Sequence, residues 1–315
     1  MSSYSFWLDV EPDISIYVRR WNSFQPAKAV IQIAHGMTEH IGRYQEFAQY
    51  LMEKGFIVYG NDHRGHGKTA DKTKEFGFFA EKEGFEKVTH DLVKVTGHIK
   101  EEYPDLPVYL IGHSMGSFLV RRYITLDTSN IAGAILLGTG SQPSFLLKAG
   151  KQLANIMNKQ KGNRSKGDFM NKLTFFGYNK RFLGNTPFDW LNSDKNEIKK
   201  YMEDEYCGFV PTNQFFYDLY SGMEKIQSKK VAKSIPRDFP LLFISGKEDP
   251  VGHYGKGVQK AVDFYKKNGM ASVELRLLPS LRHELLNEKS KYEIFDEIIS
   301  WILGQNTCYF DEKSL

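Results

Sequence analysis

The chain has 315 residues, 14% of them aromatic and 25% charged, a composition typical of a globular protein and not of a disordered one. Its 42 basic and 38 acidic side chains leave a net charge of +4, so nucleic-acid binding is not expected. Two cysteines, Cys207 and Cys308, form neither a disulfide framework nor a metal pattern. The N-terminus lacks a signal-peptide pattern, and no run reaches the ~18 apolar residues that span a bilayer, so we expect a cytoplasmic protein.

The first third of the chain alternates apolar runs with helical patterns. It contains three predicted strands, the first exposed and the others apolar and β-branched like buried strands, at 15–21, 29–34 and 56–59. Apolar residues recur at three- and four-residue spacing over 44–51 and over 85–101, which predicts two amphipathic helices. Strands that alternate with helices predict a mainly parallel α/β sheet with right-handed crossovers.

The next stretch carries the strongest motif of the chain. An apolar run at 108–111 predicts a buried strand, Gly112-His113-Ser114-Met115-Gly116 is a G-x-S-x-G turn, and a helix is predicted over 118–125. In a sharp strand-to-helix turn, small neighbours relieve crowding and the serine hydroxyl projects above the sheet. The helix N-terminus behind it offers free N–H groups to a developing anion. Ser114 is therefore the candidate nucleophile, against the alternative of a glycine-rich turn that contains serine by chance.

The alternation of strands and helices breaks after residue 140. Residues 141–231 carry helical and loop patterns with many aromatic side chains and no convincing parallel strand. A strand at 131–137 precedes this segment, and two strands and a helix follow it at 239–245, 273–278 and 291–303, before an expected loose tail at 307–315. We therefore predict an α/β core formed by residues 1–140 and 232–315, with a mainly helical cap inserted at 141–231.

Two later strands end at residues that a serine nucleophile requires. A serine at its ordinary pKa needs an adjacent base, and the base needs an acid that fixes its tautomer. Asp249 follows the 239–245 strand and His283 follows the 273–278 strand. Reactive groups of α/β sheets collect at the carboxyl ends of strands, and the order Ser, Asp, His is the order of α/β-hydrolases. We predict that Ser114, Asp249 and His283 form a catalytic triad.

Three neighbouring residues are weaker candidates for these roles. Glu248 is adjacent to Asp249 but is expected to point the other way. His253 lies in the same loop as Asp249 and is expected at the surface. His113 adjoins the serine, but the turn is expected to direct its side chain into the core.

Acyl transfer also requires hydrogen-bond donors for a tetrahedral oxyanion. The backbone N–H of Met115, directly after the candidate nucleophile, supplies one donor. The second is expected from the loop after the 29–34 strand, where Gly36 permits a sharp bend and the N–H of Met37 can face inward. We predict an oxyanion hole formed by Met37 and Met115.

Taken together, these motifs resemble the monoacylglycerol lipase and lysophospholipase family of serine α/β-hydrolases. The matching segments are 35–40 followed by Arg43-Tyr44, 62–67, 112–116, 245–251 and 283–284, and the cap stretch 206–212 is similar to that of bacterial lysophospholipases. The resemblance implies the α/β-hydrolase fold, the triad and oxyanion donors above, and no metal or other cofactor. Ser117 is a departure, because many relatives have a second glycine there.

Two sets of polar residues in these motifs remain to be assigned a role. Asp62 and Arg64 are expected to form a structural ion pair that braces their loop. Glu39, His40 and Arg43 either contact a polar head group near the pocket mouth or form a merely structural cluster.

The favoured function is hydrolysis of carboxylic esters, such as monoacylglycerols, lysophospholipids or similar acyl esters, through an acyl-enzyme on Ser114. One alternative is an aminopeptidase-like or C–C bond hydrolase on the same fold. An aminopeptidase should hold the substrate ammonium with acidic cap residues, for which Glu203, Asp204 and Glu205 are available. The other alternative, a non-catalytic binding module, would be expected to lack a triad residue, and none is missing.

The cap is expected to bind the acyl chain of the substrate. Aromatic side chains predicted to line an acyl channel include Phe145, Phe209, Phe215 and Phe216. A helix over 145–157 places Leu146, Ala149, Leu153 and Met157 on one side and lysines alongside. That apolar side either turns down over the pocket or lies against a lipid surface, which would make the protein peripheral to membranes.

Overall fold

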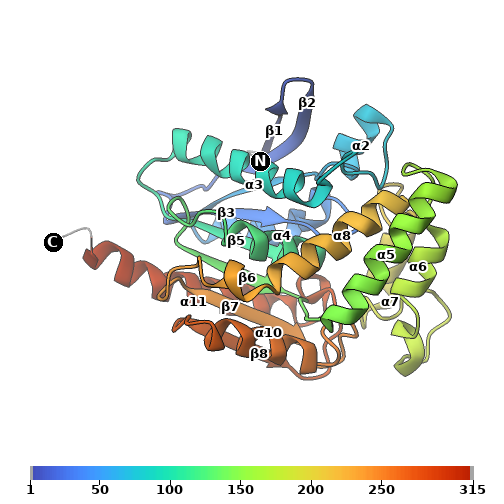
Figure 1. Ribbon diagram of the computed structural model, residues 1–315. Coiled ribbons are helices and arrows are strands. Elements are labelled where there is room, and N and C mark those ends of the chain that lie inside the picture. The colour runs from blue at the N-terminus through green and yellow to red at the C-terminus, as the bar shows by residue number, and fades with distance from the viewer. Residues whose placement is uncertain (1–2, 313–315) are drawn as a thin grey trace.

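The computed structural model describes residues 3–312. One sheet contains the strands β1 (Ser3–Glu11), β2 (Ile14–Trp21), β3 (Ala29–Ala34), β4 (Phe56–Asn61), β5 (Val108–His113), β6 (Gly133–Leu137), β7 (Leu241–Gly246) and β8 (Val273–Leu278). Its spatial order is β1-β2-β4-β3-β5-β6-β7-β8 (Figure 1). β1 has no counterpart among the predicted strands. It pairs antiparallel with β2, and β2 pairs antiparallel with β4. All pairs from β4 to β8 are parallel, which confirms the predicted mainly parallel α/β sheet.

Helices cover both faces of this sheet. In chain order they are α1 (Gln45–Glu53), α2 (Gly67–Thr73), α3 (Gly84–Glu102), α4 (Met115–Tyr123), α5 (Ser144–Lys161), α6 (Asp168–Thr174), α7 (Lys195–Glu203), α8 (Asn213–Ile226), α9 (Lys229–Ala232), α10 (Lys256–Lys267) and α11 (Lys291–Glu312). Short 3₁₀ turns lie at η1 (Ile41–Tyr44), η2 (Tyr178–Arg181) and η3 (Leu285–Asn287). α11 continues well past its predicted end, so the loose tail expected from residue 307 is wrong as far as residue 312, and residues 313–315 lie outside the described part.

Two apolar cores lie on opposite faces of the sheet. Neighbouring residues of a strand point to opposite faces, so Val30 and Ile31 of β3 belong to different cores. Side chains of α3, α4 and α10 build the core that contains Val30, and those of α1 and α11 build the core that contains Ile31. Every residue of β3 to β7 is buried, as expected for parallel strands covered on both faces.

The helices α5 to α9 occupy the chain between β6 and β7, where the cap was predicted. α5, α6 and α7 stand together at one end of the sheet, and α8 runs from them back across the core (Figure 1). α8 packs on α3 and α4 as well as on α5, and its fully buried Phe215 and Phe216 belong to the core of the sheet. The division into a core at 1–140 and 232–315 and a cap at 141–231 therefore stays a prediction, because α8 belongs to the proposed cap in sequence but packs in the core of the sheet.

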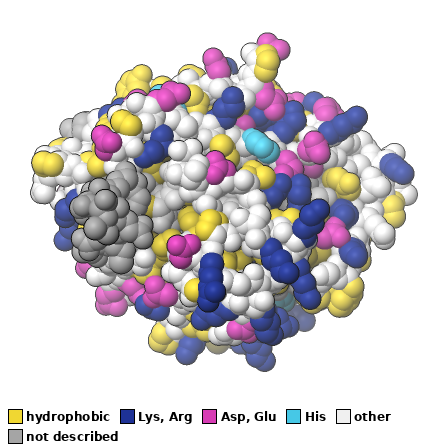
Figure 2. Space-filling view, turned by 60° about the vertical axis from the view of Figure 1, so that its left-hand side comes forward, with side chains coloured by type: hydrophobic (Ala, Val, Ile, Leu, Met, Phe, Trp, Pro, Cys, Tyr) yellow, Lys and Arg dark blue, Asp and Glu magenta, His cyan; other side chains and the backbone are white. Residues whose placement is uncertain are grey.

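The surface is mixed in charge. In the view of Figure 2, Lys and Arg side chains gather toward the lower right, and acidic and hydrophobic side chains are interspersed over the rest of the face. Within residues 3–312, no helix combines the length and the apolar character that crossing a membrane demands.

Three buried histidines hold together the loops that follow β3 and β4. His63 donates its backbone N–H to His35 Nε2 at 3.0 Å, and its ring Nε2 lies 3.2 Å from the His35 carbonyl oxygen. The His66 ring is 5.3 Å from the His35 ring, and its Nδ1 donates to the Arg64 carbonyl oxygen. Burial lowers the pKa of His35 well below its ordinary value, that of His63 to about 3 and that of His66 to about 4. These rings are therefore neutral at pH 7.

Small residues let α4 start directly against the sheet. A Cβ on Gly116 would lie 2.0 Å from the Ala34 carbonyl oxygen at the end of β3. A Cβ on Gly112 would lie 2.5 Å from the Gly116 carbonyl oxygen. Because backbone atoms are in the way at both positions, a side chain there must displace the strand or the helix.

Gly116→Ala should lower the free energy of unfolding by about 3 kcal/mol, because its methyl group overlaps the β3 backbone. Gly97→Ala is the matched control, since a Cβ there, within α3, meets nothing within 4 Å. That change should raise the free energy of unfolding by about 0.5–1 kcal/mol through helix propensity. Urea unfolding followed by circular dichroism measures both values. Similar stability changes in the two variants would contradict the close approach.

The histidine cluster predicts a loss of stability in acid. A buried histidine whose folded pKa lies below 6.5 takes up its proton only on unfolding, so stability falls as pH drops from about 6.5 toward 4. His66→Asn keeps a donor for the Arg64 carbonyl but cannot titrate. The urea midpoint should therefore fall less between pH 7 and pH 5 in this variant than in the wild type. His90→Asn, at an exposed position of α3, should follow the wild type, and equal slopes in all three proteins would refute this account.

Candidate active site

The turn between β5 and α4 holds Ser114 in a strained conformation. Its φ of 52° and ψ of −118° are sparsely populated for a residue with a side chain. Its N–H donates to the Leu137 carbonyl oxygen at 2.9 Å, and its carbonyl oxygen accepts from the Ser117 N–H at 2.9 Å and from the Ser117 hydroxyl at 2.5 Å. Ser117, the departure from the family pattern, therefore braces this turn with a bond that glycine could not make.

Asp249 and His283 lie side by side behind this turn. His283 Nδ1 donates to Asp249 Oδ2 at 2.9 Å, and both side chains are fully buried. Asp249 Oδ1 accepts the Val251 N–H at 2.8 Å, so both carboxylate oxygens are fixed. A proton held on Nδ1 leaves Nε2 with the lone pair that a general base needs.

The candidate nucleophile and the candidate base both lie next to the carboxyl end of β6. Leu137, the last residue of β6, accepts the N–H of Ser114. Gly138 follows it with a φ of +57°, and a Cβ there would lie 3.0 Å from the His283 ring. The end of β6 therefore contacts Ser114 through Leu137, and the following residue, Gly138, lies next to the imidazole of His283.

The weaker candidates are placed elsewhere. Glu248 is exposed while its neighbour Asp249 is buried. His253 is exposed, and its Nε2 lies 2.8 Å from Gln142 Oε1. His113 is buried and contacts Glu39 and the backbone of His283.

The two predicted oxyanion donors flank Ser114. Met115 is the first residue of α4, a position whose N–H has no partner within a helix. On the other side, a Cβ built on Gly36 would lie 3.3 Å from Ser114 Cβ, so the loop that carries Met37 passes close to the serine. Thr38 follows in a left-handed conformation with a φ of 53°. Met115 is thus adjacent to Ser114 in the turn, and the loop that carries Met37 passes beside it, an arrangement compatible with the proposed oxyanion hole.

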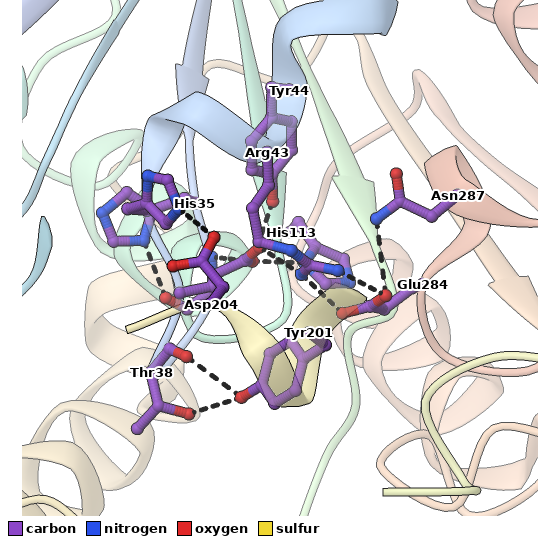
Figure 3. A network of polar contacts seen from close by, with 12 residues as sticks. His35, Thr38, Arg43, Tyr44, His113, Tyr201, Asp204, Glu284 and Asn287 are labelled. Carbon is purple, nitrogen blue, oxygen red and sulfur yellow. Dashed lines mark hydrogen bonds and ion pairs between the residues drawn. The ribbon is translucent and has the colours of Figure 1, made fainter. Parts of the chain in front are cut away.

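A buried polar cluster underlies the site (Figure 3). The Arg43 guanidinium donates to both oxygens of Glu284, at 2.6 and 2.9 Å, and to Glu39 at 2.9 Å. Glu39 also accepts the Gly36 N–H at 2.6 Å and the Tyr44 hydroxyl at 2.9 Å. Burial raises the pKa of Glu39, but the His113 hydrogen bond and the Arg43 charge outweigh it and hold this pKa well below its ordinary value. Of the two roles left open by the sequence, the contacts of Glu39 and Arg43 support the structural one.

His40, Asp204 and Cys207 are the three described side chains that could hold a metal ion. The Gly42 N–H donates to His40 Nδ1, so the ring proton is on Nε2, which donates to Asp204 Oδ2 at 2.9 Å. In that tautomer neither ring nitrogen has a free lone pair for a metal. Burial also raises the pKa of the Cys207 thiol, away from the thiolate that binds metals. The hydrogen bond between His40 and Asp204 therefore links the loop after β3 to the end of α7, a structural role that suits these residues better than metal binding.

The predicted ion pair between Asp62 and Arg64 is wrong. Arg64 pairs with Asp91 of α3 through two hydrogen bonds of 2.7 and 2.8 Å. Asp62 instead accepts the backbone N–H groups of Ile41 and Lys68, both at 2.8 Å. Both oxygens of Asp62 thus accept backbone N–H groups and leave none for Arg64. The partner of Arg64 is instead on α3, a helix distant in sequence.

The predicted acyl-channel residues lie in three different environments. Phe145 is 70% exposed at the start of α5, whereas Phe215 and Phe216 are fully buried in the core. Phe209 is half-buried between the His66 and Phe76 rings, and the backbone N–H of its neighbour Gly208 donates to the Thr38 carbonyl oxygen. Phe209 is thus the member of this set whose chain neighbour contacts the loop after β3 that carries Met37, called the oxyanion loop below.

Sequence reasoning did not anticipate how the inserted segment contacts the base. The Leu191 carbonyl oxygen accepts the backbone N–H groups of His283, at 3.1 Å, and of Glu284, at 2.8 Å. The Trp190 ring lies 5.0 Å from the His283 ring. Arg282 donates to the carbonyl oxygens of Asp189 and Asn192. The only sequence signal was the presence of a tryptophan in the segment, which does not reveal its neighbour.

Comparison with known proteins finds similarity over most of the chain. Residues 25–290 match the protein family described as "Serine aminopeptidase, S33". The human protein named monoglyceride lipase is 31% identical over 91% of this chain and 86% of its own length. A monoglyceride lipase homolog of monkeypox virus is 26% identical over 92% of this chain and 95% of its own length.

Solved structures agree as well. A thermostable carboxyl esterase from Bacillus coagulans, solved with glycerol, superposes with a TM-score of 0.89 at 28% identity, over 97% of this chain and 99% of the esterase. The predicted α/β-hydrolase fold is thereby confirmed. The family match and the likeness to the human protein both extend over most of the chain. The chain therefore belongs to this family of hydrolases and is a monoacylglycerol lipase-like member of the α/β-hydrolase fold.

Proposed function

We propose that this protein hydrolyses carboxylic esters of monoacyl lipids, such as monoacylglycerols, lysophospholipids or similar acyl esters, through an acyl-enzyme on Ser114. The observation that carries the proposal is the buried Asp249–His283 pair packed against the strand end that also holds the strained Ser114. The names of the relatives, monoglyceride lipase and carboxyl esterase, support the ester as the bond that is broken.

In the proposed reaction, His283 Nε2 takes the proton of the Ser114 hydroxyl while Oγ attacks the ester carbonyl carbon. The backbone N–H groups of Met37 and Met115 stabilise the resulting oxyanion. The intermediate collapses, the carbon–oxygen bond to the alcohol breaks, and the alcohol leaves with the proton from Nε2. Water then repeats these steps on the acyl-enzyme and releases the fatty acid. Asp249 holds the Nδ1 proton and stabilises the transient imidazolium throughout.

The aminopeptidase alternative has weaker support, although the family description contains that word. It needs free carboxylates to hold a substrate ammonium. Asp204 is occupied by His40 and by the Tyr206 N–H. Glu203 is 65% exposed and pairs with Lys199, and Glu205 is also exposed. These acidic side chains are engaged or solvated, which favours an uncharged acyl ester as substrate.

The cap surface supports a second part of the proposal, contact with lipid membranes. α5 turns Leu147, Gly150 and Ala154 inward, whereas Leu146 and Ala149 are exposed and Leu153 and Met157 are half-buried. Of the two orientations left open for this helix, the exposure of Leu146 and Ala149 supports the one that faces a lipid surface. Gly150 permits this packing, because a Cβ there would lie 3.0 Å from the Tyr220 ring of α8. α5, α6 and the segment after them consequently expose large apolar side chains, namely Phe145, Leu146, Ile156, Phe169, Leu173 and Phe176. Exposed lysines 148, 159 and 172 accompany them, a combination that suits anionic lipid surfaces.

Ser114→Ala should abolish turnover of a chromogenic acyl ester and labelling by a fluorophosphonate, because the nucleophile is lost. Loss of a triad residue should lower kcat by several powers of ten. Asp249→Asn should also be strongly impaired through the wrong imidazole tautomer, while Glu248→Gln, at the exposed neighbouring position, should keep wild-type kcat. A purified Ser114→Ala protein with near-wild-type turnover would end the assignment. A wild-type protein that cleaves aminoacyl amides faster than acyl esters would favour the aminopeptidase alternative.

Phe145→Ser should weaken co-sedimentation with vesicles of phosphatidylcholine and phosphatidylglycerol, because it removes an exposed aromatic ring from the proposed contact surface. Phe24→Ser is the matched control, since Phe24 is 64% exposed but lies in the loop between β2 and β3. Added salt should weaken vesicle binding as it screens the lysines. Equal vesicle binding by the two variants, or no binding by the wild type at low salt, would refute the membrane contact.

A further inference from the structure

His113, the residue before Ser114, has a hydrogen-bond acceptor at each ring nitrogen. Nδ1 lies 3.0 Å from Glu39 Oε1, and Nε2 lies 3.3 Å from the backbone carbonyl oxygen of His283. A neutral imidazole carries one N–H, so one of these contacts would set a nitrogen lone pair against an oxygen lone pair. Glu39 is ionised, since its Oε1 already accepts the Gly36 N–H and the Tyr44 hydroxyl, so both contacts are satisfied only when the ring is doubly protonated.

The charges around His113 balance when it is an imidazolium. Glu39 and Glu284 carry two negative charges, and Arg43 and His113 then carry two positive ones, with all four side chains at least 91% buried. The adjoining cavity has a volume of about 10 Å³ and is lined by these residues with Tyr44, Phe47, Leu286 and Asn287. That volume holds about one water molecule, so these charges compensate one another and are not solvated.

The groups that face His113 come from three elements. Glu39 and Arg43 stand in the loop after β3 and the turn η1, where the Tyr44 ring also lies 6.5 Å away. Glu284 and the His283 ring, 4.8 Å away, belong to the loop after β8. Burial lowers the pKa of His113, but the hydrogen bond and charge of Glu39 and the charge of Glu284 outweigh it and raise this pKa above its ordinary value.

We propose that His113 is held as an imidazolium and acts as a positioning residue that ties the oxyanion loop to the loop of the catalytic base. The inference rests on the proposed function of Ser114, Asp249 and His283. Glu39, which His113 grips, also accepts the Gly36 N–H at 2.6 Å, directly before the proposed donor Met37. Nε2–H of His113 then holds the backbone of His283. One ring thereby sets the distance between the oxyanion donor and the base.

Such a residue acts on the transition state more than on substrate binding. The oxyanion donor matters most once charge develops on the substrate oxygen, so its misplacement lowers kcat and leaves KM nearly unchanged. A shift of about 1 Å in such a group can cost about 10²-fold in rate.

The first test reads the protonation of His113 without any use of activity. In the full-length protein labelled with ¹⁵N-histidine, one-bond ¹⁵N–¹H correlations should show two N–H protons on the same ring at pH 7. Both signals should vanish in His113→Gln. A single ring N–H for His113 at pH 7 overturns the proposal. This outcome is independent of the Ser114 assignment, which the Ser114→Ala and fluorophosphonate experiments test separately.

The second test uses Glu39→Gln, whose amide oxygen can still accept the Gly36 N–H but which removes the charge beside His113. The imidazolium should now deprotonate within the ordinary histidine range. kcat for a chromogenic ester should fall about 10-fold at pH 7 and further as pH rises, with KM unchanged. Glu248→Gln, an exposed carboxylate, is the control and should keep the wild-type pH profile. A Glu39→Gln profile of kcat against pH that superimposes on the wild type would refute the positioning role.

Discussion

The strained turn at Ser114 is the constraint on which the rest of this structure depends. A positive φ at a serine survives only where its surroundings over-determine it. Here the N–H is held by the end of β6 and the carbonyl oxygen by Ser117. The approach of α4 to β3 leaves no room for a side chain at Gly116. The positions of β3, β5 and β6 in the sheet therefore fix the position of the Ser114 hydroxyl group.

Charge, more than apolar packing, joins the loops around that hydroxyl. Arg43 links the loop after β3 to the loop after β8, and Glu39 links the oxyanion loop to β5 through His113. Removing one partner from such a buried set leaves an uncompensated charge, which is strongly destabilising. Any other arrangement of Glu39, Arg43, His113 and Glu284 would leave a buried charge unpaired, so this cluster fixes the relative positions of the loops. Such fixed positions suit the proposed proton transfer and oxyanion stabilisation.

The inserted segment contacts the proposed catalytic base, His283, directly. The Leu191 carbonyl oxygen holds the backbone of the His283 loop, the carbonyl oxygens of Asp189 and Asn192 accept from the Arg282 guanidinium, and the Trp190 ring lies 5.0 Å from the imidazole. α8 meanwhile packs into the core of the sheet. The part of the insertion with the most exposed apolar surface, α5 and α6, precedes residues 189–192 in the same chain segment. The insertion therefore contains both a fixed part that supports the base and an outer part that faces the surroundings.

Local pattern alone determined the mainly parallel sheet, the place of the serine turn in the chain and the three polar residues that follow strands. Each of these depends on short-range signals: β-branched runs, helical periodicity, glycine at a crowded turn, and polar residues directly after a strand. Tertiary structure alone decided the partners of buried charges. Arg64 binds Asp91 and not nearby Asp62, Arg43 binds Glu284, and Leu191 holds His283. No local sequence pattern predicts these partners. A buried charge or backbone amide pairs with any suitable group that the fold brings within about 3 Å, whatever its distance in sequence.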